Sequence, residues 1–383
     1  MKLFKEKLAW AAPIAVILII ALFSVNLFVQ GDPKATNLPV ALIVNDEGAH
    51  VDAVRAAVEQ MSQGINGEDP VVAFSTEKEE NIEDLFKDKQ YYAALVVPEG
   101  YNDAVQNAVT NNAAATLKIY VNQGFNMTGA NYAKSALNAL IGQISKQYSA
   151  GFLNQMNDQK IDASQASVIV NPIVPEEKVF NAVTSATANG SAPILMAMPA
   201  WVGALIGGFI LFLATSKMAK KERLTPRQSV RVMGSQILFG VIIALFSGFT
   251  VATLGSIAGV NMPSYFLVGS FVSFAAFCFF LLVSAVTAWI GKPAITLFMV
   301  VMLLGMGVIM MPKEMIPDFF VTFVRPWIPI RFAGDGLREI FYFGSGFYTG
   351  ESFNIILGIG AVGLVVYLLS FFKPVRNKTV SIK

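Results

Sequence analysis

The sequence predicts an integral membrane protein, an α-helical bundle of six transmembrane helices (one before and five after an inserted extracellular α/β domain). Composition gives the first indication, because 54% of the 383 residues are hydrophobic and 14% are charged. A soluble domain usually carries about 25% charged residues. The second indication is a series of long uncharged runs. The third is a single long polar stretch, residues 31–190, which contains 19 acidic and 10 basic residues.

The chain begins with a basic segment and an apolar run. Three lysines among the first seven residues precede the uncharged run Leu8–Val29. About 20 apolar residues suffice for a helix to cross the hydrocarbon core of a bilayer. The run is longer than the apolar core of a signal peptide, and the residues after it do not form a small-residue cleavage site. Residues 1–30 are therefore predicted to be a cytoplasmic N-terminal segment and an uncleaved first span.

Residues 31–190 show short apolar strand patterns that alternate with helical patterns. The helical patterns have apolar residues spaced three and four apart, whereas the strands are short apolar runs that end at turn residues. The predicted strands are Pro39–Val44, Val71–Phe74, Tyr91–Val97, Thr116–Val121 and Val168–Val170. The predicted helices are Val51–Met61, a charged helix around Ile82–Phe86, Tyr101–Val109 and Asn126–Met156. This alternation indicates an α/β domain with a mixed or parallel sheet.

The rest of the chain, residues 191–383, contains five further apolar runs of spanning length. They are Pro193–Thr215, Val232–Ile257, Tyr265–Ile290, Ala294–Met311 and Phe353–Phe372. Basic residues gather in the N-terminal segment, in the loop 216–231, at Lys292 and in the C-terminal tail. Short basic loops stay on the cytoplasmic side of a membrane. Both termini are therefore expected in the cytoplasm and residues 31–190 outside, and this basic surplus does not indicate nucleic-acid binding.

The loop Ser216–Arg231 is the largest internal segment expected in the cytoplasm. It holds six basic residues and one acid, and Thr225–Pro226 has the pattern of a helix start, with threonine as N-cap and proline at the first helical position. Two interpretations stay open: a coupling helix that docks a cytoplasmic ATPase, or a basic loop that contacts only anionic lipid headgroups. The residues expected to carry coupling are Lys220, Lys221, Arg223, Leu224 and Arg227.

The segment 312–352, expected on the outer side, is too apolar for a free loop, yet prolines and charges divide it into pieces too short to span the membrane. Arg331 and Asp335 have i,i+4 spacing, and Asp335 and Arg338 have i,i+3 spacing. We predict two short helices that dip into the outer leaflet; the alternative is an amphipathic helix on the membrane surface. The residues that define this re-entrant segment are Pro317, Trp327, Pro329, Arg331, Asp335 and Arg338.

Small residues recur within the predicted spans. Gly203 and Gly207 form one GxxxG pattern, Gly255 and Gly259 form another, and three glycines cluster between residues 358 and 363. Such spacing lets two helices approach closely, so these residues are candidates for helix packing. The alternative is the ordinary abundance of glycine in membrane helices.

Several kinds of chemistry are not indicated. The sequence contains no G-x-x-x-x-G-K-[ST] phosphate loop, and Gly291–Lys292 is followed by proline. A metal site is not expected, because His50 and Cys278 are the single histidine and cysteine; His50 is interpreted as a solvated residue that starts a helix. No Asp, Glu, Lys or Arg occurs within a predicted span, and ion-coupled carriers usually need such groups. We expect no catalytic residues and no directly bound cofactor.

Four stretches resemble a known family. They are LPVALIVNDEGA at Leu38–Ala49, YYAALVVPEGYNDAV at Tyr91–Val105, APILMAMPAWVGALIGG at Ala192–Gly208 and WIPIRFAGDGLREI at Trp327–Ile340. Together with one span, a large outside domain and five further spans, they resemble a type-2 ABC transporter permease. More narrowly, they are similar to the phage-infection protein (YhgE/Pip) branch. The resemblance covers nearly the whole chain, although the outside domain is shorter than the coiled-coil ectodomains of typical phage-infection proteins.

The resemblance implies a half-transporter in a bacterial cell membrane. A second permease copy, identical or related, would complete the pathway, and ATP would act through a separately encoded cytoplasmic ABC ATPase. Transport would be outward, with an apolar or amphipathic substrate. The alternative function is a membrane-anchored surface receptor or secretion scaffold that acts through its extracellular domain.

Overall fold

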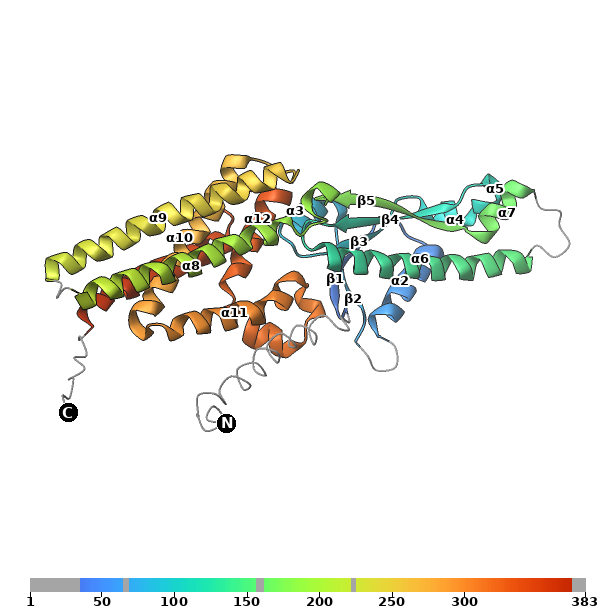
Figure 1. Ribbon diagram of the computed structural model, residues 1–383. Helices are drawn as coiled ribbons and strands as arrows, with labels where there is room; N and C mark the ends of the chain where they lie inside the picture. The colour runs from blue at the N-terminus through green and yellow to red at the C-terminus, as the bar shows by residue number, and fades with distance from the viewer. Residues whose placement is uncertain (1–34, 65–68, 156–161, 222–224, 374–383) are drawn as a thin grey trace, which may run out of the picture. The chain divides into compact units, whose positions relative to one another are not determined.

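The computed structural model describes residues 35–64, 69–155, 162–221 and 225–373 (Figure 1). The predicted first span, Leu8–Val29, lies outside these residues. The chain divides into two compact units. In the described part, an α/β unit contains residues up to Thr184 together with Met311–Asp318, and a helical unit contains Ser185–Met310 and the residues from Phe319 onward. The α/β unit therefore includes a short segment from the region that the sequence placed in the membrane domain.

The α/β unit is built on one five-stranded sheet. Its strands are β1 (Leu38–Val44), β2 (Val72–Glu77), β3 (Ala93–Val97), β4 (Ala115–Asn122) and β5 (Ile173–Phe180), in the order β2-β1-β3-β4-β5. Strands β2, β1 and β3 are parallel to one another, β4 and β5 are parallel, and β3 and β4 are antiparallel. Of the two predicted arrangements, mixed or parallel, the sheet is mixed.

Helices cover both faces of this sheet. Alternating residues of β1, β3 and β4 point to one face, where α2 (Ala49–Ser62), α4 (Tyr101–Gln106) and α6 (Met127–Gln155) supply most of the remaining core. The opposite face has a smaller core, in which α3 (Ile82–Lys87) packs Ile82 and Phe86 against the sheet. The predicted single helix over Tyr101–Val109 is instead two helices, α4 and α5 (Ala108–Asn111), interrupted at Asn107.

The last predicted strand of this unit is wrong. Residues 168–170 end a helix, α7 (Ala163–Val170), whose start is held by a capping box between Asp162 and Gln165. The strand comes directly afterwards, as β5. Its sequence IVPEEKVF resembles a loop because it contains a proline and three charges, but β5 is an edge strand. At an edge, Pro175 removes no ladder hydrogen bond that a further strand would need.

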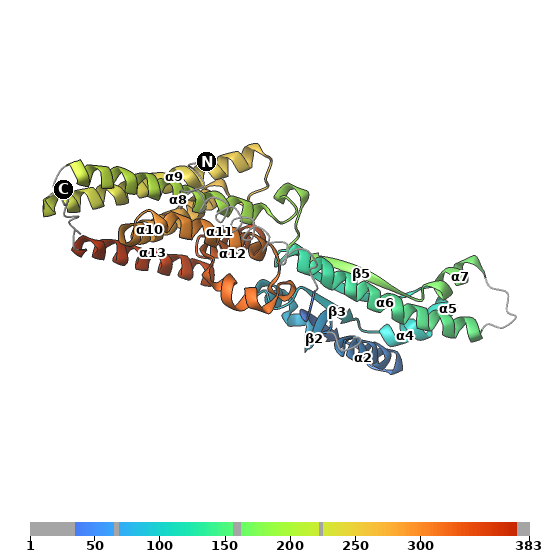
Figure 2. The same cartoon turned by 60° about the horizontal axis from the view of Figure 1, so that its bottom comes forward.

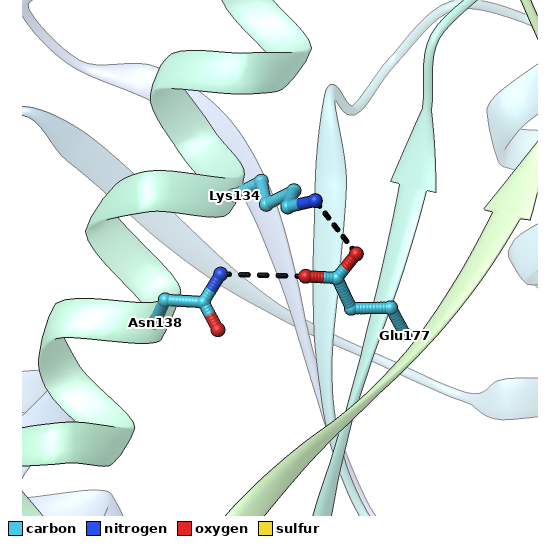
Figure 3. Close-up of polar contacts among 3 residues, drawn as sticks. All are labelled: Lys134, Asn138 and Glu177. Carbon is cyan, nitrogen blue, oxygen red and sulfur yellow. Dashed lines mark hydrogen bonds and ion pairs between the residues drawn. The ribbon is translucent and has the colours of Figure 1, made fainter.

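The longest helix of the unit, α6, is joined to β5 by a polar contact (Figure 3). Lys134 and Asn138 both point from α6 toward Glu177. The Lys134 ammonium lies 2.6 Å from Glu177 Oε2, and the Asn138 amide donates to Glu177 Oε1 at 3.5 Å. Both charged side chains are about one-third exposed. Because solvent screens the attraction between partly exposed charges, this ion pair adds little to the stability of the unit. Its main effect is to fix the position of α6 on the edge strand.

Residues 311–318 form part of the α/β core. Met315 is 3% exposed within the main cluster. The carbonyl oxygen of Glu314 accepts hydrogen bonds from the backbone amide and the hydroxyl of Thr36, both at 3.1 Å, and its carboxylate accepts from the Tyr92 hydroxyl at 2.8 Å. A segment about 130 residues downstream of the rest of this unit thus contributes both apolar and polar contacts to it.

The helical unit contains five long apolar helices among the described residues. They are α8 (Ala192–Lys221), α9 (Pro226–Ile257), α10 (Tyr265–Ile290), α11 (Pro293–Met310) and α13 (Glu351–Leu369), with a 3-10 turn at Ser370–Phe372. Each coincides within a few residues with a predicted span, except that α8 and α9 extend by one to two turns into the basic loop. The shorter α12 (Pro329–Tyr342) lies between α11 and α13 in the chain.

Helix α10 is the centre of this unit. It packs against α8, α9 and α13 (Figure 2). About two-thirds of the residues in its most apolar 18-residue stretch are buried. By contrast, α9 has large apolar side chains on its outer side, including Phe246, which is 71% exposed, and Ile257. An apolar outer surface of this kind is what hydrocarbon solvates well.

Candidate functional site

The basic loop predicted from the sequence is built from the end of α8 and the start of α9. Thr225 is the N-cap of α9, and Pro226 is its first residue. The Thr225 hydroxyl accepts from the Gln228 amide at 3.4 Å, and the Gln228 side chain accepts from the Thr225 amide at 2.8 Å. The predicted helix start is therefore confirmed, and this capping box satisfies two amide groups that would otherwise be free. Helix α9 then continues without a break to Ile257.

The predicted coupling residues are distributed around this turn. Lys220 and Lys221 belong to the last turn of α8. Arg223 and Leu224 lie outside the described residues. Arg227 is exposed in the first turn of α9, and so is Arg231 one turn later. The cationic side chains at the start of α9 are therefore free to meet a partner or lipid headgroups, although a helix N-terminus is not where positive charge is most favourable.

The first predicted glycine pair lies between α8 and α9. A methyl group added at Gly203 would be 3.2 Å from Ser247 Oγ, and one at Gly207 would be 2.9 Å from the Ile243 side chain. Both neighbours belong to α9, so the two glycines lie at one helix contact. Gly255 has the flexible methyl end of Met196 as its nearest neighbour, at 3.1 Å.

Gly259 has a second role besides the predicted helix packing. It has φ +78° and lies just after α9, and no atom of the described residues comes within 4 Å of a methyl group built on it. Its amide donates to the Ser256 carbonyl at 3.1 Å, and the Val260 amide donates to the Gly255 carbonyl at 2.9 Å. These two bonds form a Schellman motif, in which glycine is favoured because the backbone is left-handed. Gly259 therefore ends the helix.

A close approach between α9 and α10 involves a stripe of buried residues that the sequence analysis did not identify. Every fourth residue of α9 is buried: Gln236, Gly240, Ala244, Gly248 and Ala252. A methyl group at Gly240 would collide with the Phe280 ring, and one at Gly248 would collide with Ser273 and the Gly269 carbonyl of α10. The sequence signal that could have revealed this stripe is the recurrence of a small residue at every fourth position from Gly240 to Ala252.

The outer segment divides into pieces, as predicted, but the pieces belong to two units. Pro317 is exposed in the segment that belongs to the α/β unit. The second part of the helical unit, from Phe319 onward, begins with a π-helical turn (Phe320–Val324) and a 3-10 turn (Arg325–Trp327), and then α12 starts at Pro329. Phe319, Phe323 and Trp327 are each more than 60% exposed, four residues apart. Such an aromatic row suits the interface between water and lipid.

Helix α12 is amphipathic and packs its apolar side into the helical unit. Leu337 and Ile340 are buried, and the helix contacts α8, α10 and α13. Asp335 pairs with Arg338 at 3.3 Å, as the spacing suggested. The other suggested pair, Arg331 with Asp335, is not among the ion pairs of the described residues. The Arg331 guanidinium lies instead 4.3 Å from the centre of the Phe332 ring, a cation–π contact.

His50 and Cys278, the residues considered as metal ligands, lie far from each other in the chain and in different units. His50 lies in the first turn of α2, but it is half-buried rather than solvated, with Nδ1 2.8 Å from the Tyr148 hydroxyl. Cys278 is buried within α10. Throughout the described ranges, no group of three His, Cys, Asp or Glu residues lies close enough together to hold a metal ion.

Comparison with known proteins gives one family match. Residues 9–372 match the model of the ABC-2 family transporter protein family. The search of curated proteins finds no significant match. One solved structure is similar: a crystal structure described as a domain assigned to an ABC type-2 transporter from Thermotoga maritima MSB8. It is 16% identical, covers 37% of this chain and 86% of its own, and has a TM-score of 0.24, too low to support a structural argument.

Proposed function

The chain belongs to the ABC-2 transporter family, and from this premise we propose that it is the permease subunit of an ABC exporter that moves an apolar or amphipathic substrate outward. The family is a multi-pass membrane component of transporters and works with a cytoplasmic ATPase. In this proposal the chain pairs with a second permease copy, identical or related, and a separately encoded ATPase binds each copy. The four stretches quoted above support membership of the YhgE/Pip branch.

The observation that carries the proposal is the continuity of α9. A separate ATPase can move a membrane pathway only through a rigid element that joins the cytoplasmic surface to a span. The Thr225–Gln228 box starts α9 within the basic loop, and the same helix continues for 32 residues. At 1.5 Å per residue this is about 48 Å, longer than the hydrocarbon core. A push at Arg227 would therefore reach α10 through the small-residue stripe of α9.

Co-purification of the ATPase tests this coupling role. Lysine in place of both Arg223 and Arg227 keeps the charge but removes the planar guanidinium forks, so docking should weaken while lipid contact persists. Leu224→Asp should also reduce recovery of the ATPase, and Lys292→Gln, at the other short basic turn, is the matched control. Normal ATPase recovery and normal export in both test variants would contradict the coupling role and direct attention to residues 1–7.

Thiol labelling tests the topology of the proposal. In a Cys278→Ser background, Glu99→Cys places one exposed thiol in the α/β unit, and Lys217→Cys places another at the end of α8. We expect a membrane-impermeant maleimide to label the first in intact cells and the second only after lysis. The reverse labelling pattern would place the α/β unit in the cytoplasm and the end of α8 outside, and it would contradict the proposed orientation of the whole chain.

A further inference from the structure

Three arginines occur in the stretch that leads into α12 and along this helix. Arg325 belongs to the 3-10 turn Arg325–Trp327, Arg331 lies in the first turn of α12, and Arg338 follows two turns later. All three are only partly exposed. A guanidinium group is always protonated in proteins, so this part of the helical unit holds three permanent positive charges.

Only one of the three charges is neutralised by a contact within the described residues. Arg338 pairs with Asp335 at 3.3 Å. Arg325 and Arg331 form no ion pair and no side-chain hydrogen bond with any described residue, and the Nε atom of each is buried without a partner. The Nη nitrogens of both groups are not among the buried atoms, so they remain accessible from outside. Polar groups in such a position usually have a partner, and here the chain does not supply one.

The surroundings of Arg331 carry an excess of positive charge. Its pKa lies below the ordinary 12.5, because the group is partly removed from water and because the charge of Arg325 repels it. The carboxylates of Asp335 and Glu351 oppose this effect, each more weakly than Arg325 contributes to it. Helix α12 also begins without a side-chain cap, so the positive end of its macrodipole adds to the two arginines. A bound anion would offset all three sources of positive potential.

Aromatic groups adjoin the two arginines. The Arg331 guanidinium lies 4.3 Å from the centre of the Phe332 ring, and a guanidinium held against a ring can still direct its planar fork at two phosphate oxygens. The exposed row Phe319, Phe323 and Trp327 precedes α12, and the ring centres of Phe319 and Phe323 are 5.5 Å apart. Aromatic side chains of this kind are typical of the level of lipid headgroups. The ligand that matches both features has an anionic head and an acyl chain.

We propose that Arg325 and Arg331 bind the phosphate group of an anionic phospholipid such as phosphatidylglycerol. Arginine binds phosphate through two parallel hydrogen bonds, and two arginines without carboxylate partners offer two such forks. A zwitterionic headgroup is less suitable, because its ammonium group would add positive charge to a site that already has an excess. The aromatic row contacts the apolar part of the lipid, which a free phosphate lacks. The site is defined by binding alone and does not depend on transport or on an ATPase.

Quenching of Trp327 fluorescence tests this site, because Trp327 is 77% exposed and belongs to the same turn as Arg325. The probe is phosphatidylglycerol with brominated acyl chains, added to the purified full-length chain in a neutral detergent. The Trp327→Phe variant gives the quenching of the other tryptophans, which is subtracted. We expect saturable quenching of the unchanged chain. Arg325→Gln and Arg331→Gln should each weaken binding about tenfold, the scale of one charge-assisted hydrogen bond.

Two further variants separate a phosphate site from general attraction of charge. Arg331→Lys keeps the charge but loses the planar fork, so it should weaken binding severalfold. Arg231→Gln is the matched control, because it removes the same charge from an exposed arginine in α9, and its affinity at Trp327 should not change. An equal loss in Arg231→Gln and Arg331→Gln would show general attraction of charge and overturn the proposal. Arg325 lies on a different turn from Arg331, so Arg325→Gln keeps the test valid if Arg331→Gln fails to fold.

Ligand controls distinguish the lipid from other occupants. Brominated phosphatidylcholine should bind at least tenfold less tightly than brominated phosphatidylglycerol, and an excess of inorganic phosphate should not displace the lipid. Equal quenching by phosphatidylcholine would indicate contact with any lipid, and displacement by inorganic phosphate would indicate a soluble phosphate compound as the ligand. Either result, or the absence of saturable quenching, would show that the proposal is wrong.

Discussion

Replacement of Gly248 by alanine tests the packing of α9 against α10 most directly. The added methyl group would lie 2.6 Å from the Ser273 amide nitrogen and closer still to the Ser273 hydroxyl and the Gly269 carbonyl oxygen. Two of these three atoms are backbone. The Ser273 hydroxyl donates to the same Gly269 carbonyl at 2.7 Å, so it cannot turn away without loss of that bond. The collision can be relieved only by a shift of one helix.

The size of the effect follows from this geometry. Ordinary contact begins near 3.4 Å, so α9 and α10 must separate locally by roughly 0.8 Å or more. Overpacking of this kind costs about 1–3 kcal/mol. Alanine recovers up to about 1 kcal/mol through its higher helix propensity, although less where the helix is already fixed by packing. We therefore expect a net loss of about 1–2 kcal/mol in the free energy of unfolding.

The assay is reversible unfolding of the purified chain by a denaturing detergent, followed by far-ultraviolet circular dichroism. Gly358→Ala on α13 is the matched control, because a methyl group there meets no atom within 4 Å. The control should be neutral or slightly stabilised. Equal stability of the Gly248 variant and the control would refute the close approach of α9 and α10.

Three further outcomes concern the α/β unit. Met315→Ala should lower the free energy of unfolding of this unit by about 2–4 kcal/mol, as measured by thermal unfolding, because it empties a core position; no change would mean that this segment does not join the core. Glu177→Gln should cost less than about 1 kcal/mol, and a double-mutant cycle with Lys134→Met should give a similarly small coupling, since the pair is partly solvated. The Asn102 backbone amide donates to the Asp46 carboxylate at 2.8 Å and holds its pKa below the ordinary 3.8. This carboxylate therefore stabilises the fold above that pH and loses its effect as the pH falls through the lower folded value. Asp46→Asn should therefore lower the unfolding temperature at pH 7 but not at pH 2, and a constant difference would contradict this.

Much of the fold could be predicted because uncharged runs of spanning length and short apolar runs that end at turn residues are visible in the sequence. The limits of α10 agree with the predicted span Tyr265–Ile290, since uncharged residues fill it and turn residues flank it. The start of α9 was equally clear, because the Thr225 side chain caps the helix through a hydrogen bond with Gln228, three residues away, and Pro226 suits the first helical position. These features depend on residues that are close in sequence.

The features that could not be predicted depend on distant partners. Strand β5 looks like a loop until β4 is placed beside it, because edge strands tolerate proline and charge. Met315 looks like part of a membrane-facing loop until the α/β core is assembled around it. For the candidate site, the stripe of buried small residues on α9 becomes recognisable only when α10 is placed against it.

The late position of residues 311–318 has a consequence for biosynthesis. When Thr184 leaves the ribosome, the α/β unit still lacks Met315 and the two bonds that Thr36 gives to Glu314. At about 5–20 residues per second, translation needs roughly 6–25 s more to deliver them. During that interval α8, α9, α10 and α11 are synthesised, so the core cannot contain Met315 until all four helices have been made. The α/β unit can therefore be completed only after α11 has been made, which couples the folding of this unit to the synthesis of the helices inserted between its two parts.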